Sequence, residues 1–210
     1  MLRSMLQQVF GLKSYSAYDD ADSVGLLPEI RDKTGHTFLG ESMDTFYKRN
    51  VSSDELFLVK LHHTPVDAGR AIYIVRDGRS SIVSRYNLLL NLRNRTDVTI
   101  SDIIRGNVLH GDWSSHLRAW DPLNRPATLF LRYQDLLQRP AEAMDRVATF
   151  IQRTPIGTWQ NNFEELHRIF PQFFHGGSDE KNLAQMTSQE HQLFWTLHRE
   201  CMQRYGLGAP

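Results

Sequence analysis

The sequence predicts an α/β fold with a parallel sheet, in one domain spanning 1–210. Three short apolar runs, 56–59, 71–75 and 127–131, are each bounded by polar or turn residues. Continuous apolar runs of this length are typical of buried parallel strands. Segments with helical apolar spacing lie between and after these runs. Strands that alternate with helices favour a parallel sheet covered by helices.

Helix-terminating and helix-starting residues support the individual helices. Gly11 follows an apolar helical pattern, Pro140 suits a first helical position, and Thr187 with Glu190 forms a capping-box pattern. The polar stretch from Lys13 to Asn50 is expected to be mostly loop with one short helix. The predicted helices cover residues 2–10, 43–49, 80–92, 103–120, 141–151 and 188–205.

Composition excludes several classes of protein. Lys and Arg total 24, as do Asp and Glu, so the formal net charge is zero and nothing global indicates a nucleic-acid partner. No apolar run approaches the roughly 18 residues that a membrane span needs. The single cysteine, Cys201, excludes an internal disulfide, and the first residues lack a signal peptide's apolar core. We therefore expect a cytoplasmic protein without membrane or nucleic-acid partners.

A strand followed by an arginine-rich turn and helix is the most informative segment. Between Arg70 and Arg95 there are six arginines and one acid, Asp77. A helix that starts directly after a strand points free N–H groups at the strand end, and this favours an anion. Arg76 and Ser84 suit a phosphate, through a two-pronged contact and a hydroxyl donor. The alternative is that these arginines only solvate a helix face.

Lys60 and His62 follow the first predicted strand, at the edge of the sheet where ligands of α/β proteins bind. Lys60 offers positive charge to a transferred anionic group, and His62 offers a base near neutral pH. The alternative is an ordinary surface loop. A metal site made by His62, His63, His110 and His116 is disfavoured, since neighbouring histidines seldom reach one ion. No metal is therefore expected.

Aromatic residues mark two further positions. Trp113, His116 and Trp120 share one helix face, a spacing that usually belongs to a core. Tyr133 follows the third predicted strand, so it faces the same sheet edge as Arg76 or caps the core.

Taken together and in this order, the motifs resemble the cytosolic-type sulfotransferases that use 3'-phosphoadenosine 5'-phosphosulfate (PAPS). Lys60-x-His62 is similar to the family's Lys-Thr-His, with leucine in place of threonine, and Arg76 and Ser84 have the spacing of its strand-Arg and Ser element. The resemblance implies a P-loop-NTPase-like three-layer sandwich. It implies His62 as catalytic base, Lys60 at the sulfuryl group, and Arg76 with Ser84 at the 3'-phosphate.

Other segments extend the resemblance over essentially the whole chain. The segment from Gly111 to Trp120 is similar to the family's helix motif without a mismatch. Tyr133 stands where a tyrosine approaches the adenine, and Phe163 stands where a phenylalanine stacks on it. The resemblance therefore implies that both residues bind the nucleotide.

The sequence departs from the family pattern at two places. The family's Arg-Lys-Gly, which closes over the 3'-phosphate, stands here as His175-Gly176-Gly177. The two cationic side chains are therefore absent, whereas the resemblance implies that the retained glycine, Gly177, binds the cofactor. Leu2-Arg3 is similar to the helix that follows the family's Pro-x-Ser-Gly-x-Thr-Trp loop. We therefore expect a domain that is N-terminally incomplete, without the first strand and the phosphosulfate loop.

The function implied is transfer of a sulfuryl group from PAPS to a small-molecule hydroxyl acceptor, an alcohol or a phenol. An alternative is a catalytically impaired or inactive sulfotransferase-like protein that still binds nucleotide. A nucleotide kinase of related architecture is disfavoured because the sequence contains no Gly-x-x-x-x-Gly-Lys-Ser/Thr. The acceptor pocket is expected from the variable segments 14–50, 87–101 and 163–181.

Overall fold

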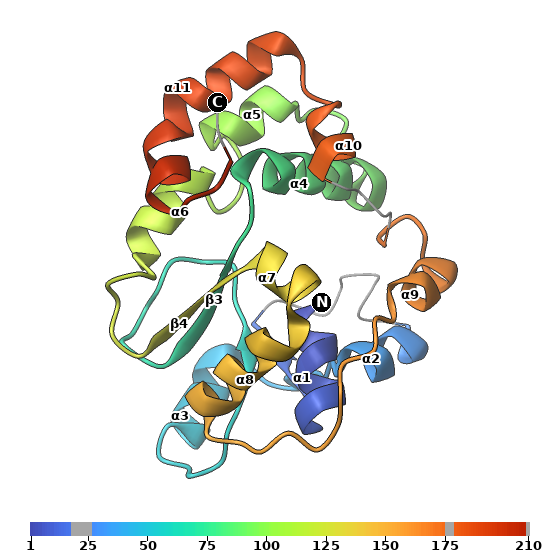
Figure 1. Cartoon of the computed structure of the whole chain (residues 1–210), viewed down its shortest axis with the longest axis vertical. Helices are drawn as coiled ribbons and strands as arrows, with labels where there is room; N and C mark the ends of the chain where they lie inside the picture. The colour runs from blue at the N-terminus through green and yellow to red at the C-terminus, as the bar shows by residue number, and fades with distance from the viewer. Residues whose placement is uncertain (18–26, 175–178, 209–210) are drawn as a thin grey trace. The chain divides into compact units, whose positions relative to one another are not determined.

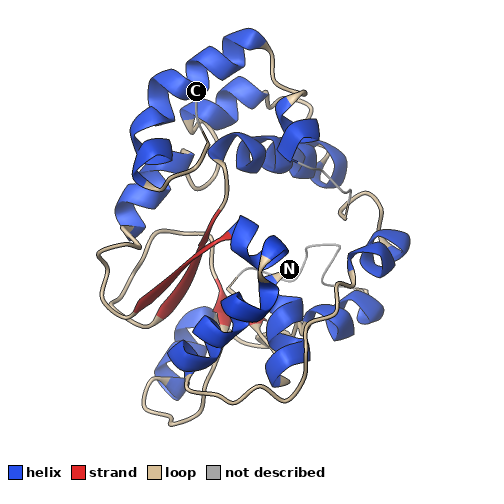
Figure 2. Cartoon of the chain, viewed as in Figure 1, coloured by secondary structure: helices blue, strands red, loops and turns tan. Residues whose placement is uncertain are grey.

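The computed structural model describes residues 1–17, 27–174 and 179–208 (Figure 1). The chain divides into two compact units. The first unit contains Met1–His62 and Arg139–Phe174, and the second contains His63–Gln138 and His175–Pro210. In the described residues, each unit combines helices with one pair of parallel strands (Figure 2).

Helices dominate the first unit. Its two strands are short and parallel, with Tyr15 opposite Val59 and Ser16 opposite Lys60. The first and last turns of its helices follow the expected rules, since Gly11 ends α1 with a φ of 67° and Pro140 is the first residue of α8. The elements are α1 (Leu2–Phe10), β1 (Tyr15–Ser16), α2 (Pro28–Thr34), α3 (Met43–Asn50), β2 (Val59–Lys60), α8 (Pro140–Ile151) and α9 (Phe163–Ile169).

The polar region after α1 is more structured than the sequence suggested. The expectation of mostly loop between Lys13 and Asn50 was wrong where β1 and α2 form. Pro28 starts α2, and the buried Ile30 anchors this short helix in the core. The strand expected at 56–59 is also shorter, because its described ladder is limited to the two residue pairs shared with β1.

A longer strand pair organises the second unit. The parallel strands β3 and β4 pair over five residues, from Ala71 opposite Thr128 to Val75 opposite Arg132. Each strand leads directly into a helical segment (Figure 1). The elements are β3 (Ala71–Val75), α4 (Gly78–Arg93), α5 (Ile100–Arg105), α6 (Trp113–Trp120), β4 (Thr128–Arg132), α7 (Tyr133–Gln138), α10 (Asp179–Leu183) and α11 (Ser188–Arg204).

The single helix expected over 103–120 is two helices, and this expectation was wrong. Gly106 ends α5 with a φ of 79°, and Gly111 also has a positive φ of 70°. Asp112 then caps the next helix, since its side chain accepts a hydrogen bond from the Ser115 N–H at 2.9 Å. The loop between the two helices therefore follows from glycine and capping chemistry.

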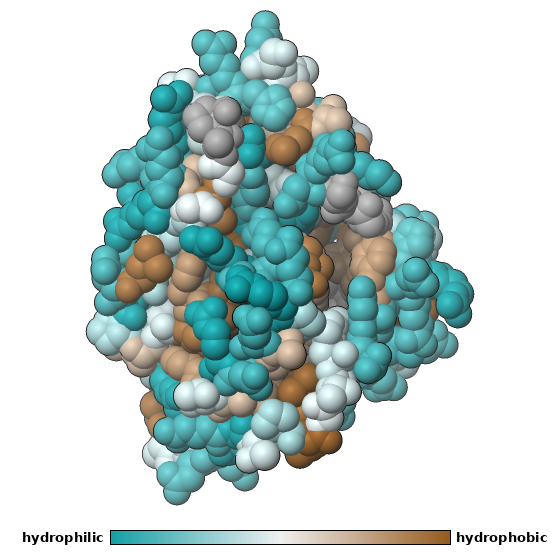
Figure 3. Space-filling view, viewed as in Figure 1, coloured by the Kyte–Doolittle hydropathy of each residue, from teal (hydrophilic) through white to brown (hydrophobic). Residues whose placement is uncertain are grey.

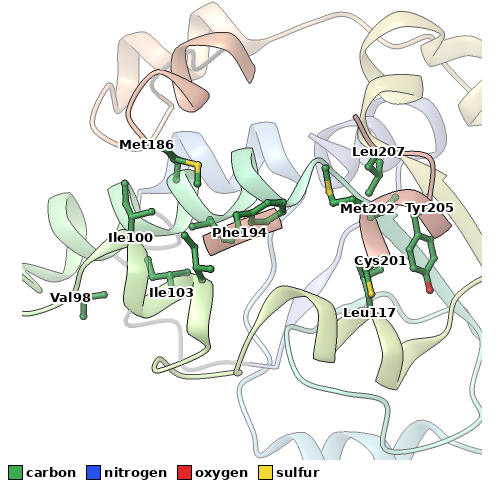
Figure 4. Close-up of a cluster of buried hydrophobic side chains, with 14 residues drawn as sticks. Val98, Ile100, Ile103, Leu117, Met186, Phe194, Cys201, Met202, Tyr205 and Leu207 are labelled. Atoms are coloured by element: carbon green, nitrogen blue, oxygen red, sulfur yellow. The ribbon is translucent and has the colours of Figure 1, made fainter. Parts of the chain in front are cut away.

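The core of the second unit lies among α4, α5, α6 and α11. Phe194 of α11 is fully buried there, as Figure 4 shows. The capping box that starts this helix is present, with Thr187 and Glu190 exchanging side-chain and backbone hydrogen bonds. The buried cluster comprises Val75, Ile82, Val83, Val98, Ile100, Ile103, Ile104, Leu117, Met186, Phe194, Cys201, Met202, Tyr205 and Leu207.

Hydrophilic side chains predominate on the face of the molecule drawn in Figure 3, with hydrophobic side chains in smaller areas between them. Among the described helices, none combines the length and apolar character needed to cross a bilayer.

Candidate functional site

Arg76 and Tyr133 lie side by side at the carboxyl end of the β3–β4 pair. The register ends with Val75 opposite Arg132, so Arg76 and Tyr133 are the next residue on each strand. The Arg76 guanidinium carbon lies 4.8 Å from the centroid of the Tyr133 ring. This cation–π contact places a cation and an aromatic face together at the edge where ligands bind in parallel sheets.

The start of α4 adds helix N–H groups to this edge. Asp77 caps the helix, with its carboxylate accepting the Arg79 N–H at 2.9 Å. A Cβ on Gly78 would come within 2.8 Å of the buried Phe194 ring, so glycine lets the helix start close to the core. Ser84 lies half-buried further along the same helix. The strand, the turn and the helix therefore place Arg76 and Ser84 on adjoining elements, as the sequence predicted.

Arg76 is already paired with a carboxylate. Its Nε and Nη2 donate to Oδ1 of Asp179 at 3.0 and 2.6 Å. Gln134 Nε2 makes a longer contact of 3.4 Å with the other carboxylate oxygen. Burial alone would raise the pKa of Asp179, but hydrogen bonds and charge from its neighbours, Arg76 among them, lower it. The carboxylate therefore stays ionised and bound to the guanidinium.

Sequence reasoning missed Asp179, which belongs to α10, a helix in contact with α4. The resemblance implied a cofactor-binding glycine at 175–177, and the acceptor pocket was expected to include 163–181, but neither expectation gave Arg76 an acidic partner. Gly177, which was predicted to bind the cofactor, lies outside the described residues. An acid near the arginine-rich segment could have been found only by knowing which distant helix packs on α4.

Other arginines of the segment have structural partners. Arg79 pairs with Asp77 at 2.7 Å, and its guanidinium carbon lies 5.1 Å from the centroid of the Trp195 ring. Arg85 Nη2 donates to the Leu109 carbonyl at 2.7 Å. The local excess of positive charge is therefore divided between structural arginines and Arg76 at the strand end.

Lys60 and His62 belong to the first unit. Lys60 is the last residue of β2 and is half-buried, whereas His62 is exposed two residues later. Burial, followed by the charge of Arg3, lowers the pKa of the Lys60 amine to about 8. Arg3 itself is held by Ser14, with its Nε donating to the hydroxyl at 2.6 Å and its Nη2 to the carbonyl at 2.8 Å. This environment keeps the positive charge of Lys60 only up to mildly alkaline pH.

Phe163 also belongs to the first unit, at the start of α9. Its side chain is 36% exposed, and its ring stacks on His167 with centroids 6.0 Å apart and planes 13° apart. One face of an exposed aromatic ring supported in this way is suited to stacking with a planar ligand.

The residues of the 111–120 motif pack inside the second unit. The Tyr73 hydroxyl and His116 Nδ1 form a 2.8 Å hydrogen bond, and the buried Trp120 donates its Nε1–H to the His63 carbonyl at 3.0 Å. Trp113 packs against Phe194 with ring centroids 6.2 Å apart. These contacts support the core interpretation of the aromatic spacing.

A serine, histidine and aspartate also meet in the second unit. Ser114 Oγ lies 2.8 Å from His198 Nδ1, and Asp112 Oδ1 lies 3.9 Å from the same nitrogen. The side chains of Ser114 and His198 are almost fully buried, and His198 Nε2 lies 2.9 Å from the Ile104 carbonyl oxygen. The group therefore satisfies buried polar atoms and has no access for a substrate. Elsewhere in the described part of the chain, no three His, Cys, Asp or Glu side chains gather as a potential metal site.

The family model described as Sulfotransferase domain matches residues 31–187. The chain belongs to the sulfotransferase family. The matched range contains every position that the sequence analysis assigned to catalysis or nucleotide binding. The family assignment made from the motifs is therefore confirmed.

Curated relatives match over shorter stretches. The chain is 30% identical to Sulfotransferase 1B1 of Mus musculus over 91 residues, which is 40% of this chain and 30% of that protein. It is 25% identical to Sulfotransferase 2A1 of Homo sapiens over 133 residues, which is 60% of this chain and 46% of that protein. The matched regions thus span less than half the length of these curated relatives.

The solved structure of mouse sulfotransferase SULT7A1 complexed with PAP is similar with a TM-score of 0.56 and 14% sequence identity. The likeness covers 96% of this chain and 90% of that chain. The P-loop-NTPase-like α/β fold expected from the sequence is therefore confirmed, with parallel strands in both described pairs.

Proposed function

We propose that this chain is a sulfotransferase that uses PAPS as donor and a small-molecule hydroxyl compound as acceptor. The observation that carries the proposal is the Arg76–Tyr133 pair at the carboxyl end of β3 and β4, beside the start of α4. A guanidinium, helix N–H groups and an aromatic face are the groups that a phosphorylated adenosine requires. The donor chemistry also agrees with the family.

In this proposal four side chains bind the nucleotide. Arg76 and Ser84 would bind the 3'-phosphate, and Tyr133 and Phe163 would contact the adenine. The aromatic ring of Phe163 is exposed, and that of Tyr133 is half-buried, so both are accessible to a base. We also propose that Gly177 binds the cofactor, on the resemblance of its segment alone.

Lys60 and His62 would act on the transferred group and the acceptor. When bound, PAPS supplies an activated sulfuryl group that is transferred to a hydroxyl oxygen. His62 would take the hydroxyl proton, which its exposed position allows, and Lys60 would neutralise negative charge at the sulfuryl group. Most of the rate enhancement would come from positioning and charge stabilisation, as in phosphoryl transfer.

The buried free thiol of Cys201 is compatible with a reducing compartment, and we propose the cytoplasm as the location of this protein.

The test compares His62→Ala with wild type and with His63→Ala, a matched change at the neighbouring residue. We expect His62→Ala to lower sulfuryl transfer from PAPS to a phenol by roughly 100-fold to 10,000-fold, because a general base contributes about that much. Binding of 3'-phosphoadenosine 5'-phosphate (PAP), measured by calorimetry, should stay within about twofold because the base acts on the acceptor.

Near-normal transfer by His62→Ala would contradict the assignment of the base. PAP binding by a wild-type chain that transfers no sulfuryl group would instead support the inactive nucleotide-binding protein.

A further inference from the structure

The edge of Arg76 that would receive a phosphate is the edge that Asp179 occupies. Nε and Nη2 form one side of the planar guanidinium, and both donate to Oδ1 of Asp179. The flat face of the same group lies over Tyr133. Guanidinium groups bind carboxylates and phosphates through the same N–H edges, so the two anions require the same donors.

The Arg76–Asp179 ion pair is exposed enough for another anion to replace Asp179. The Arg76 side chain is 20% exposed and the Asp179 side chain is 38% exposed, so water and ligands reach the carboxylate. Asp179 is the first residue of α10, and its second oxygen makes a long contact of 3.4 Å with Gln134 Nε2. A phosphate that carries up to two negative charges can therefore displace this single carboxylate from Arg76.

We propose that Asp179 competes with the 3'-phosphate for Arg76 and so sets the affinity and selectivity of this chain for 3'-phosphorylated nucleotides. The inference rests on the proposed function. In the free protein Asp179 holds the guanidinium in place over Tyr133. In the bound protein the phosphate replaces the carboxylate, and the free energy of the broken ion pair reduces the net affinity.

The experiment measures binding of PAP and of adenosine 5'-phosphate, which lacks the 3'-phosphate, by calorimetry. Asp179→Asn keeps the side-chain shape and removes the competing charge, and it should tighten PAP binding about threefold to tenfold. Binding of adenosine 5'-phosphate should change by less than about twofold, because that ligand does not need Arg76. Asp179→Ala serves as a second variant, and melting curves check that both variants fold.

Two controls separate competition at Arg76 from a general effect of charge. Glu180→Gln removes the neighbouring exposed acid of the same helix and should leave PAP affinity unchanged. In an Arg76→Ala background, Asp179→Asn should no longer tighten PAP binding, because the contested donor is gone.

The outcomes distinguish this inference from the proposed function. Wild-type binding of PAP that Asp179→Asn and Asp179→Ala leave unchanged would overturn the competition while the nucleotide-binding function stands. Equal tightening by Glu180→Gln, or tightening that persists without Arg76, would also overturn it. Failure of wild type and both variants to bind PAP would refute the nucleotide-binding function and the inference together.

Discussion

Arg76 and Lys60 illustrate how a side chain's surroundings decide its availability. Both residues follow or end strands, and the sequence alone assigns both to anion binding. The structure shows that Arg76 is bound to a carboxylate, whereas the Lys60 amine has a pKa lowered to about 8 by burial and by Arg3. Arg76 must therefore break an ion pair before it binds an anion, whereas Lys60 must be protonated to do so, and its lowered pKa makes this harder.

The lowered pKa of Lys60 predicts an alkaline limit on activity. A lysine is cationic below its pKa, so Lys60 loses its charge as the pH rises through about 8 rather than through 10.5. Under the proposed function, kcat/KM for PAPS should fall roughly tenfold by about pH 9, since this ratio reports groups of the free enzyme. The measurement is a pH profile of sulfuryl transfer between pH 6 and 10.

Lys60→Arg tests whether this residue causes the limit. A guanidinium stays protonated throughout that range, so the alkaline decline should disappear even if the maximal rate is lower. A profile for Lys60→Arg that declines at the same pH as wild type would assign the limit to another group.

Under the proposed function, the junction from β3 to α4 is the element on which nucleotide binding depends. Arg76 follows the strand, Asp77 caps the helix, and Gly78 lets the first turn approach Phe194 and Trp113. A helix that started further from the core would move its N–H groups away from the strand end. The geometry of this junction therefore couples packing of the core to the position of the groups that we propose bind the phosphate.

Gly78→Ala is predicted to destabilise the second unit. The added methyl group would lie within 3.0 Å of two rings, and Phe194 is fully buried and cannot move freely. Overpacking of this kind costs about 1–3 kcal/mol. Urea denaturation should show the loss, whereas Asn91→Ala, an exposed change on the same helix, should be neutral or slightly stabilising. Equal stability of Gly78→Ala and wild type would show that the junction tolerates a shift.

For the whole chain, nucleotide binding should appear as thermal stabilisation. A ligand that binds only the folded protein at 100 times its Kd adds about 2.7 kcal/mol of stability. For a chain of this size that corresponds to a rise in Tm of about 5–10 °C, measurable by differential scanning fluorimetry with PAP. Adenosine 5'-phosphate at the same concentration should raise the Tm less. The same rise with Arg76→Ala would contradict the role given to Arg76.

Local patterns predicted most helix positions correctly. Gly11, Pro140 and the Thr187–Glu190 capping box act within one helical turn, so their effect is readable from neighbouring residues. The prediction of a single helix over 103–120 was wrong because it followed the apolar spacing alone. Gly106 and Gly111 have positive φ angles, which end one helix and lead to the next. The predicted strands 71–75 and 127–131 correspond to β3 and, within one residue, to β4, whereas the strand predicted at 56–59 is only two residues long, since a ladder depends on a partner elsewhere in the chain.

The family, the α/β fold and the placement of Arg76 and Tyr133 at strand ends could all be predicted from the sequence, because they follow from motif order and from strand-to-helix connections. The roles of the site residues stay predictions. The tertiary structure was needed to show that Asp179 binds Arg76, and that burial, together with the charge of Arg3, lowers the pKa of Lys60. Both effects join residues more than 50 positions apart in the chain, and electrostatic interactions depend on distance in space and on burial rather than on sequence separation.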